Sequence, residues 1–503
     1  MTTTTSFRPR DGSVAGLVPD TTADAVSAAL ERAAAAAAAL AGVSPGTRRG
    51  WLRAVADAIE AHRGELVALA DEETALGVER LTGEVARTAA QLRFYGDVAA
   101  DGSYLGITVD SATATTPRLV RVNRPVGPVA VFGASNFPFA FSVLGNDTAS
   151  ALAAGCPVIA KAHPAHVRLS VRLAEIATGA LVRAGAPEGA FSLVVGHEAG
   201  LRLVQSDSLA AVAFTGSQSG GMALWRLANE RERVIPVFAE MGTVNPVVLT
   251  PAALERVPEI AAGFVGSFTL GAGQFCTKPG ILLAPTGGGV PAAVGQALTD
   301  AAPHPVMLTR SIAASVQVGL GELTDAGATV VRAVPASQQG WSAPAAVLSA
   351  PVSALKPGSR LLEECFGAVA VVVEYETAEE LRSALAVLQG SLVGSVMTGA
   401  GDDPDAAWLV DALTAKVGRV AMNDWPTGVA FTWAQQHGGP WPATSVPSAT
   451  SVGAGALARF VRPVTYQSAR DAWLPVEARS DNPWWLPRRV DGRPEGPDQG
   501  SAT

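Results

Sequence analysis

Four short apolar runs, each followed by a loop and a helix-forming segment, constrain the fold of this chain more than any other feature. They read VGPVAVF at 126–132, CPVIAK at 156–161, FSLVV at 191–195 and LAAVAF at 209–214. Continuous apolar runs of this length are typical of parallel strands buried on both faces. Repetition of strand, loop and helix in this order predicts an α/β chain with a doubly wound parallel sheet, which binds ligands at the carboxyl ends of its strands.

The loops after these runs suit a dinucleotide by position but not by motif. None of them carries the G-x-G-x-x-G fingerprint that marks an ordinary dinucleotide-binding turn. The loop TGSQSGG after the fourth run does lead into a helix, whose first N–H groups can face a pyrophosphate. A plain turn between strand and helix has the same composition, so both interpretations stay open at this point.

Length and charge exclude several function classes. A chain of 503 residues is long enough for two or three domains. Its 37 Lys and Arg against 45 Asp and Glu give a net charge of −8, so nucleic acid is not an expected partner. The N-terminus MTTTTSFRPRDGS has no apolar core and no later run reaches the roughly eighteen apolar residues of a membrane span. Only three cysteines occur, too few for a disulfide framework, which predicts a reducing, cytoplasmic location.

The segment GAGQFCTKPG at 271–280 is where we expect chemistry. Cys276 lies among glycines that allow close backbone approach, after the apolar FVGSFTL, which predicts a buried helix ending at a loop. A thiol reacts as its thiolate, so a nearby group must activate it. A lone cysteine in such a chain is more often a structural thiol, and the flanking glycines favour the nucleophile instead. Cys156 and Cys365 have no such surroundings and are interpreted as fillers of the core.

Six motifs in a fixed order carry a family resemblance. They are RPVGPVAVFGASNFPFAF, AAGCPVIAKAHPAH, VAFTGS, FAEMGTVNP, GQFCTKPG and LLEECFG. Together they resemble the aldehyde dehydrogenase superfamily over nearly the whole chain. The variants ASNFPFAFS and FAEMGTVNP most resemble its branch of 2-oxoglutarate semialdehyde (2,5-dioxovalerate) dehydrogenases and related NADP-dependent fatty aldehyde dehydrogenases.

The resemblance implies a fold with three parts. A Rossmann-like cofactor domain is expected at residues 1–106 and 125–240, and an α/β catalytic domain at residues 241–456. A β-arm for oligomerisation with a C-terminal tail is expected at 107–124 and 457–503, its last residues, PEGPDQGSAT, being disordered. Strand addition through such an arm removes exposed sheet edges and predicts a homodimer or a dimer of dimers.

The resemblance also assigns catalytic roles. Cys276 attacks the aldehyde to give a thiohemiacetal, which is oxidised by hydride loss and then hydrolysed as a thioester. Asn136, expected at the start of a helix, stabilises the oxyanion together with the Cys276 N–H, or else only caps that helix. Glu240 acts as the general base with a pKa raised by burial, or else is a solvated carboxylate at a strand end. His437 is a second base or a thiolate partner, or else bonds loop backbone, and we expect no metal.

For the cofactor, the resemblance favours NADP, with NAD as the alternative. Lys161 reaches the adenine ribose in relatives, and NAD-selective relatives carry a glutamate three positions later, where this chain has Pro164. Without that carboxylate, a 2′-phosphate is not repelled. Departures from the pattern at Cys365 and Ala368 predict a looser loop around the nicotinamide ribose. The expected cofactor residues are Lys161, His163, Pro164, Gly196, Thr215, Gly216, Ser217, Gly220, Glu364 and Phe366.

The expected reaction is oxidation of 2,5-dioxovalerate to 2-oxoglutarate. Its distal carboxylate needs a cation, for which Lys278 is the nearest candidate in sequence. A fatty aldehyde is the alternative, and an apolar funnel for it would draw on Phe137, Phe139, Phe431, Trp433 and Trp441. Two other classes stay open: a cysteine hydrolase that pairs Cys276 with His437, and an inert binding member of the fold.

Overall fold

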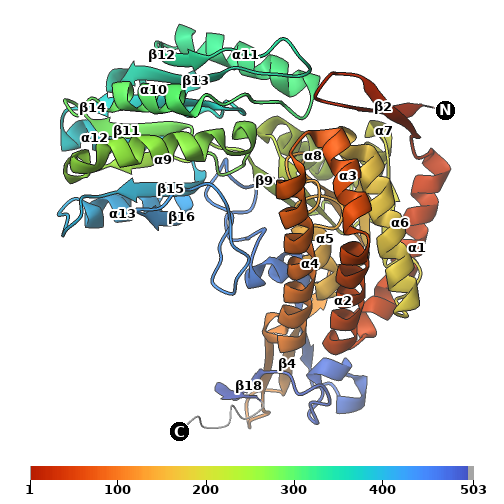
Figure 1. Cartoon of the computed structure of the whole chain (residues 1–503). Coiled ribbons are helices and arrows are strands. Elements are labelled where there is room, and N and C mark those ends of the chain that lie inside the picture. Colours follow the sequence, from red (N-terminus) through yellow and green to blue (C-terminus); the bar gives the residue numbers. More distant parts are fainter. Residues whose placement is uncertain (1, 497–503) are drawn as a thin grey trace.

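The computed structural model describes residues 2–496, so the end of the predicted disordered tail, 497–503, lies outside the described range. The described chain contains three main sheets and an N-terminal hairpin (Figure 1). The hairpin joins β1 (Thr3–Phe7) to β2 (Val14–Pro19). Two of the main sheets are covered by helices on both faces, and the third lies at the far end of the long helices.

The first large sheet is parallel and is the one expected from the four apolar runs. Its strands, in spatial order, are β7 (Phe191–Val194), β6 (Val158–Lys161), β5 (Val129–Phe132), β8 (Ala211–Gly216) and β9 (Val237–Met241). Alternate residues of these strands enter two different cores. Helices on one face are α2 (Pro45–Ala61), α4 (Val78–Asp101), α5 (Asn146–Ala154) and α6 (Val167–Arg183), with α3 (Arg63–Thr74) packed against α4 and α6. Helices on the other face are α1 (Ala23–Gly42), α7 (His197–Gln205) and α8 (Gln218–Asn229).

Helix α1 is the one helix of the described residues that is long and apolar enough to cross a membrane by composition. This corrects the expectation that no run reaches the length of a membrane span; the run of alanines at Ala33–Ala39 accounts for it, because alanine counts as apolar. One face of α1, with Val26, Leu30 and Ala33, packs into the core beneath the parallel sheet. Helix α1 is therefore a core helix of this sheet.

The second large sheet holds seven strands and lies beside the first (Figure 1). The spatial order is β12 (Thr329–Val334), β13 (Ala345–Pro351), β14 (Val369–Tyr375), β11 (Ile281–Pro285), β10 (Val247–Leu249), β15 (Ser391–Met397) and β16 (Val417–Met422). All neighbours are parallel except β12, which pairs antiparallel with β13 at the edge. Covering helices are α9 (Val257–Thr269) and α10 (Val290–Ala301) on one face, and α11 (Arg310–Asp325), α12 (Ala378–Val387) and α13 (Ala406–Thr414) on the other.

The third sheet joins distant parts of the chain. Its order is β17 (Val461–Gln467), β4 (Leu119–Pro125), β3 (Ile107–Asp110), β18 (Arg488–Val490) and β19 (Arg493–Glu495). Strand β19 takes up the start of the tail that was expected to be disordered, which is a correction at Pro494 and Glu495. Strands β18 and β19 are short and pair with each other, and β18 pairs in addition with β3, about 380 residues earlier in the chain, so no local signal marks them.

Candidate active site

The nucleophile loop runs between α9 and β11 and is shaped by glycine. Gly271 and Gly273 have positive φ angles of 58° and 71°, which side chains tolerate poorly. A Cβ on Gly273 would overlap the backbone of Gly367, in the loop that carries Glu364 and Phe366. The glycine therefore lets the nucleophile loop lie directly on that second loop.

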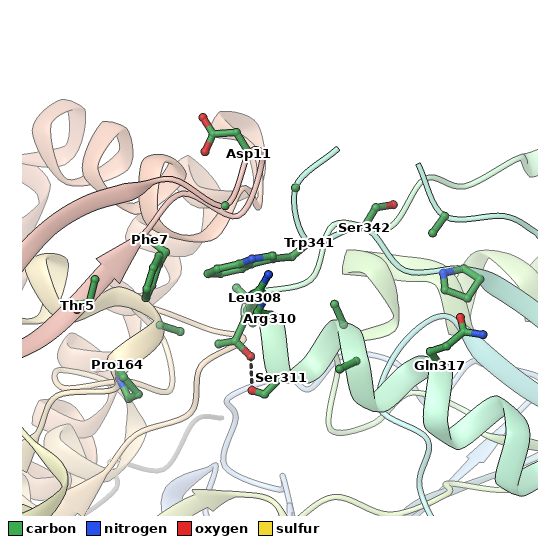
Figure 2. A pocket seen from close by; sticks show the side chains of 18 residues that line it. Thr5, Phe7, Asp11, Pro164, Leu308, Arg310, Ser311, Gln317, Trp341 and Ser342 are labelled. Atoms are coloured by element: carbon green, nitrogen blue, oxygen red, sulfur yellow. Dashed lines mark hydrogen bonds between the residues drawn. The ribbon is translucent and has the colours of Figure 1, made fainter. Parts of the chain in front are cut away.

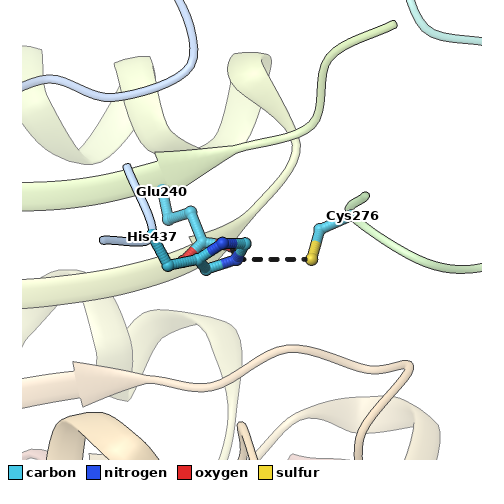
Figure 3. A group of neighbouring side chains, drawn as sticks. All are labelled: Glu240, Cys276 and His437. Atoms are coloured by element: carbon cyan, nitrogen blue, oxygen red, sulfur yellow. Dashed lines mark hydrogen bonds and ion pairs between the residues drawn. The ribbon is translucent and has the colours of Figure 1, made fainter. Parts of the chain in front are cut away.

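Cys276, His437 and Glu240 lie together, although 197 residues separate the first and last of them in sequence (Figure 3). The Sγ of Cys276 is 3.8 Å from Nε2 of His437, and the same nitrogen is 3.0 Å from Oε1 of Glu240. His437 and Glu240 are buried, whereas Cys276 is partly exposed at the cavity wall. A single imidazole nitrogen thus faces both the thiol and the carboxylate, so it can take the thiol proton while the carboxylate stabilises the charge that forms.

Burial and charge set the protonation of this group. Burial raises the pKa of Glu240, but the charge and hydrogen bonds of His437, with further help from Ser451 and Arg459, more than offset it. The net pKa of Glu240 is therefore lowered, which corrects the raised pKa expected from burial alone. Burial, followed by the charges of Glu240 and Glu364, raises the pKa of Cys276 well above its ordinary value. The resting site thus holds a neutral thiol beside an ionised carboxylate.

Glu240, Cys276 and His437 are also residue types that commonly bind metal ions. Their donor atoms lie within 4.8 Å of one another, and Cys, His and carboxylate are ligands that zinc accepts. A metal bound there would occupy Cys276 and so block its attack on a carbonyl. Our expectation that no metal takes part stays a prediction.

Asn136 does not begin a helix, contrary to the expectation from sequence. It lies in the loop after β5, and the next helix, α5, begins ten residues later with Gly145 as its N-cap. The helix-cap alternative for Asn136 is therefore wrong. Its Nδ2 donates to the carbonyl oxygen of Gln274 at 2.7 Å, two residues before Cys276. One N–H of this amide remains for an oxyanion beside the thiol.

Three residues that the sequence interpretation passed over hold the group in place. Asn245 donates from Nδ2 to the carbonyl oxygens of Cys276 at 2.8 Å and of Lys278 at 3.1 Å. The hydroxyl of Ser451 donates to Glu240, and buried Arg459 pairs with Asp147 at 2.8 Å. Asn245 was within the motif FAEMGTVNP and so was marked by sequence. Ser451 and Arg459 lie in segments without any motif.

A cavity of about 530 Å³ opens in front of Cys276 at the carboxyl ends of the parallel strands. It is lined by the catalytic candidates Asn136, Glu240 and Cys276. Eight of the ten expected cofactor residues also line it: His163, Pro164, Thr215, Gly216, Ser217, Gly220, Glu364 and Phe366.

The other two expected cofactor residues do not line this cavity. Lys161 ends β6, and its side chain lies against Gly200 of α7. Gly196 has a φ of +105°, and a Cβ there would overlap Asp20, so its glycine is explained by chain packing. Burial, followed by the charges of His166 and Lys161, lowers the pKa of His163 far below its ordinary value. A neutral His163 is a weak partner for a phosphate.

The cavity fits a dinucleotide by its polar groups. Ser217 caps α8 through Gly220 N, which leaves the first N–H groups of the helix free at the cavity. The carboxylate of Glu364 is buried with no partner on Oε1 among the described residues. Burial raises the pKa of Glu364 to about 7, with Lys278 and Arg360 opposing the rise. Such an orphaned carboxylate is suited to accept hydrogen bonds from ribose hydroxyls.

Lys278 is buried and bonds backbone carbonyls, which corrects its expected role as the cation for the distal carboxylate. Its side chain is 1% exposed, and its Nζ donates at 2.8 Å to the carbonyl oxygens of Cys365 and Val369. These two carbonyls flank Phe366, so the lysine clamps the loop that carries the cofactor residues. The looser loop expected from Cys365 and Ala368 stays a prediction, and these two bonds are a restraint on the loop that the sequence did not reveal.

A second cavity, of about 960 Å³, lies next to the first (Figure 2). It is bounded by the N-terminal hairpin, with Phe7, and by the start of α11, with Arg310. Phe7 and Trp341 meet across it with their ring centroids 5.6 Å apart. Pro164, Thr309 and Ser311 line both cavities, so Pro164 lies where they join.

Comparison with known proteins identifies the family. The model of the aldehyde dehydrogenase family matches residues 2–440. The chain belongs to the aldehyde dehydrogenase family. It is an oxidoreductase that acts on aldehydes, and this family uses NAD or NADP.

Two curated relatives and one solved structure place it further. Alpha-ketoglutaric semialdehyde dehydrogenase 2 of Azospirillum brasilense is 45% identical over 462 residues, covering 89% of this chain and 87% of the relative. Alpha-ketoglutaric semialdehyde dehydrogenase of Acinetobacter baylyi is 39% identical over 456 residues, covering 88% and 86%. An NAD-dependent aldehyde dehydrogenase from Sinorhizobium meliloti has the same fold, with a TM-score of 0.79, 23% identity and coverage of 93% and 92%. The aldehyde dehydrogenase fold expected from the motifs is confirmed.

Proposed function

We propose that this aldehyde dehydrogenase oxidises 2,5-dioxovalerate to 2-oxoglutarate with NADP. The observation that carries the reaction type is the contact of Cys276 with His437 and Glu240 at a cavity that fits a dinucleotide. The substrate is supported by the two relatives named for alpha-ketoglutaric semialdehyde. Retention of Glu240 favours hydrolysis to a free acid over transfer of the acyl group to another thiol.

In the proposed mechanism, the side chains of this chain handle two protons. His437 takes the thiol proton of Cys276, and the ionised Glu240 at 3.0 Å stabilises the imidazolium that forms. The thiolate adds to the aldehyde carbon, and Asn136 and the Cys276 N–H bind the resulting oxyanion. NADP, when bound, supplies the hydride acceptor that converts the thiohemiacetal to a thioester. Glu240 then takes a proton from the water that releases the acid, and the imidazolium of His437 returns its proton to the Cys276 thiolate.

The preference for NADP over NAD rests on Pro164 and its surroundings. A carboxylate at this position would repel a 2′-phosphate, and proline carries no charge. Pro164 also opens onto the larger cavity, where Arg310 is exposed and has no ion-pair partner within residues 2–496 (Figure 2). The space and the cation both favour a phosphate at this end of the cofactor site.

We also propose the domain division and the assembly expected from the sequence. The first sheet would be the cofactor domain, the seven-stranded sheet the catalytic domain, and the third sheet the oligomerisation arm. Strand β17 lies at an edge of the third sheet, where its outer backbone groups can pair with a second copy. We propose a homodimer or a dimer of dimers, which light scattering after gel filtration tests. The three free cysteines support a reducing, cytoplasmic location.

The aromatic funnel of the fatty aldehyde alternative is only partly present. Phe139 is fully buried in the core under α4, whereas Trp433 and Trp441 are 58% and 55% exposed. Only Phe137 and Phe431 join a small apolar cluster in the loops beside the nucleophile. Long apolar chains thus have little continuous surface here.

The test follows reduced cofactor by absorbance with NADP and a series of aldehydes. We expect kcat/KM for 2,5-dioxovalerate to exceed that for unbranched aldehydes of three to ten carbons. A steady rise of kcat/KM with chain length would instead support a fatty aldehyde enzyme. Release of acid from esters with no reduced cofactor from any aldehyde would support the cysteine hydrolase.

A further inference from the structure

The segment 426–431 forms a wall beside the nucleophile. The backbone N–H of Gly428 donates to Oγ1 of Thr277 at 3.0 Å, so this segment is bonded to the residue after Cys276. Val429 and Phe431 pack on the apolar cluster that includes Phe141. The wall therefore lies next to the reacting thiol, on the side away from the parallel sheet's cofactor loops.

Two arginines from distant elements hold this wall. Arg87, on α4, donates from one terminal nitrogen to the carbonyl oxygen of Val429 at 2.6 Å. Arg419, on β16, donates from one terminal nitrogen to the carbonyl oxygens of Pro426 and Gly428, both at 2.7 Å. Both side chains are half-buried. In each, the other terminal nitrogen bonds no protein group of the described residues, and neither arginine forms an ion pair there.

A row of aromatic rings connects Arg87 to the nucleophile. The guanidinium of Arg87 lies 5.5 Å from the ring centre of Phe431 and 6.0 Å from that of Phe141. Phe141 meets Phe137 at 5.3 Å, and Phe137 meets Phe275, the residue before Cys276, at 4.9 Å. Burial lowers the pKa of Arg87 and of Arg419. The charge of Glu84 opposes this most at Arg87 and that of Asp424 most at Arg419, and the charge of Cys276 follows in both.

The acidic groups that act most on the two arginines, Glu84 on Arg87 and Asp424 on Arg419, form no ion pair with either of them among the described residues. Oε1 of Glu84 accepts the backbone N–H groups of Phe139 at 2.8 Å and of Ala140 at 3.0 Å. Burial raises the pKa of Glu84, and these bonds and the charges of Arg80 and Arg87 oppose the rise. A half-buried pair of guanidiniums without a carboxylate partner is unusual, because desolvated charges are normally paired.

We propose that Arg87 and Arg419 bind the distal carboxylate of the substrate while its aldehyde carbon lies at Cys276. The inference rests on the proposed function, since it names the group that recognises an acid-bearing aldehyde. Guanidinium groups bind carboxylates through charge-assisted hydrogen bonds, and the free nitrogen of each arginine supplies a donor. The aromatic rings between the arginines and the thiol then line the uncharged middle part of the substrate.

The test compares an acid with a neutral aldehyde of the same length in wild type, Arg87→Gln and Arg419→Gln. Glutamine removes the charge but keeps an amide that can donate to the wall. We expect kcat/KM for 2,5-dioxovalerate to fall by roughly 10- to 100-fold in each variant, through KM, as for loss of one partner of a desolvated charge pair. Turnover of pentanal should stay within about threefold, which also shows that the variants are folded. Glutarate should inhibit pentanal oxidation competitively in wild type and at least about tenfold more weakly in the variants.

The control is Arg93→Gln, which removes an arginine from the same helix α4. Arg93 pairs with Asp57 and Glu60 on the protein surface, so both substrates should be unaffected. Equal losses for both aldehydes in Arg87→Gln, with Arg87→Lys failing to restore the acid, would show a structural role and overturn the inference. If wild type does not favour the acid over pentanal, the proposed substrate fails instead. If wild type favours the acid and both variants keep that preference, the proposed substrate is supported, but Arg87 and Arg419 do not bind its distal carboxylate.

Discussion

Replacing Glu364 by glutamine should stabilise the cofactor-free enzyme at alkaline pH and not at acidic pH. Burial raises the pKa of Glu364 from an ordinary 4.5 to about 7, so the folded state holds this proton more tightly than the unfolded chain. The stabilisation from the bound proton is complete below pH 4.5 and is lost as pH rises through 7. A shift of this size corresponds to at most about 3 kcal/mol of unfolding free energy at pH 8.

The assay is the melting temperature of wild type and Glu364→Gln at pH 5 and pH 8, without cofactor. We expect the variant to melt about 3 °C higher than wild type at pH 8 and within about 1 °C of it at pH 5. The matched control is Glu363→Gln, because Glu363 is the exposed neighbour and its charge is solvated. Adding NADP should stabilise wild type more than Glu364→Gln, since the carboxylate is proposed to bind the ribose. If wild type and Glu364→Gln differed in melting temperature by the same amount at both pH values, the raised pKa of the buried Glu364 carboxylate would be refuted.

Four further changes test the site. Cys276→Ala should lower aldehyde oxidation by at least about a thousandfold yet keep NADP binding by fluorescence titration, since the thiol forms no hydrogen bond with any of the expected cofactor residues; appreciable residual turnover would exclude it as the nucleophile. Glu240→Gln should keep hydride transfer but slow thioester hydrolysis, visible as a burst of reduced cofactor before a slow steady state, and an unchanged rate without a burst would contradict its role as base. Pro164→Glu should raise the Kd for NADP by about tenfold and leave that for NAD, measured by calorimetry, whereas an unchanged NADP affinity would mean that the ribose lies elsewhere. Lys278→Met should raise KM for NADP by about tenfold with a smaller effect on kcat, because the cofactor loop loses its clamp; Lys416→Met, which also removes bonds to two backbone carbonyls but at a residue that does not line the cavity, is the control that should not change KM.

The parallel sheet and the position of the nucleophile could be predicted from sequence because their signals are local. An apolar run such as 126–132 is buried whichever partner covers it, so its composition alone indicates a strand. The glycines around Cys276 likewise indicate a backbone that approaches other chain segments closely. The structure shows this approach at Gly273, which packs against the backbone of Gly367. The ordered motifs added the family, which the comparison confirmed.

Only the tertiary structure determines where the charged side chains lie and which groups they contact. Sequence placed Lys278 near the nucleophile, but its side chain turns away to bond carbonyls almost ninety residues later in the chain. Burial alone predicts a raised pKa for Glu240. His437 and Ser451, about 200 residues later in the sequence, lie beside Glu240 in the fold, and because of them its pKa is lowered instead. Arg87 and Arg419 carry no motif, and they share a wall only because α4 and β16 converge on it. Local composition records burial and backbone shape, whereas electrostatic energy depends on distances between groups that only the folded chain brings together.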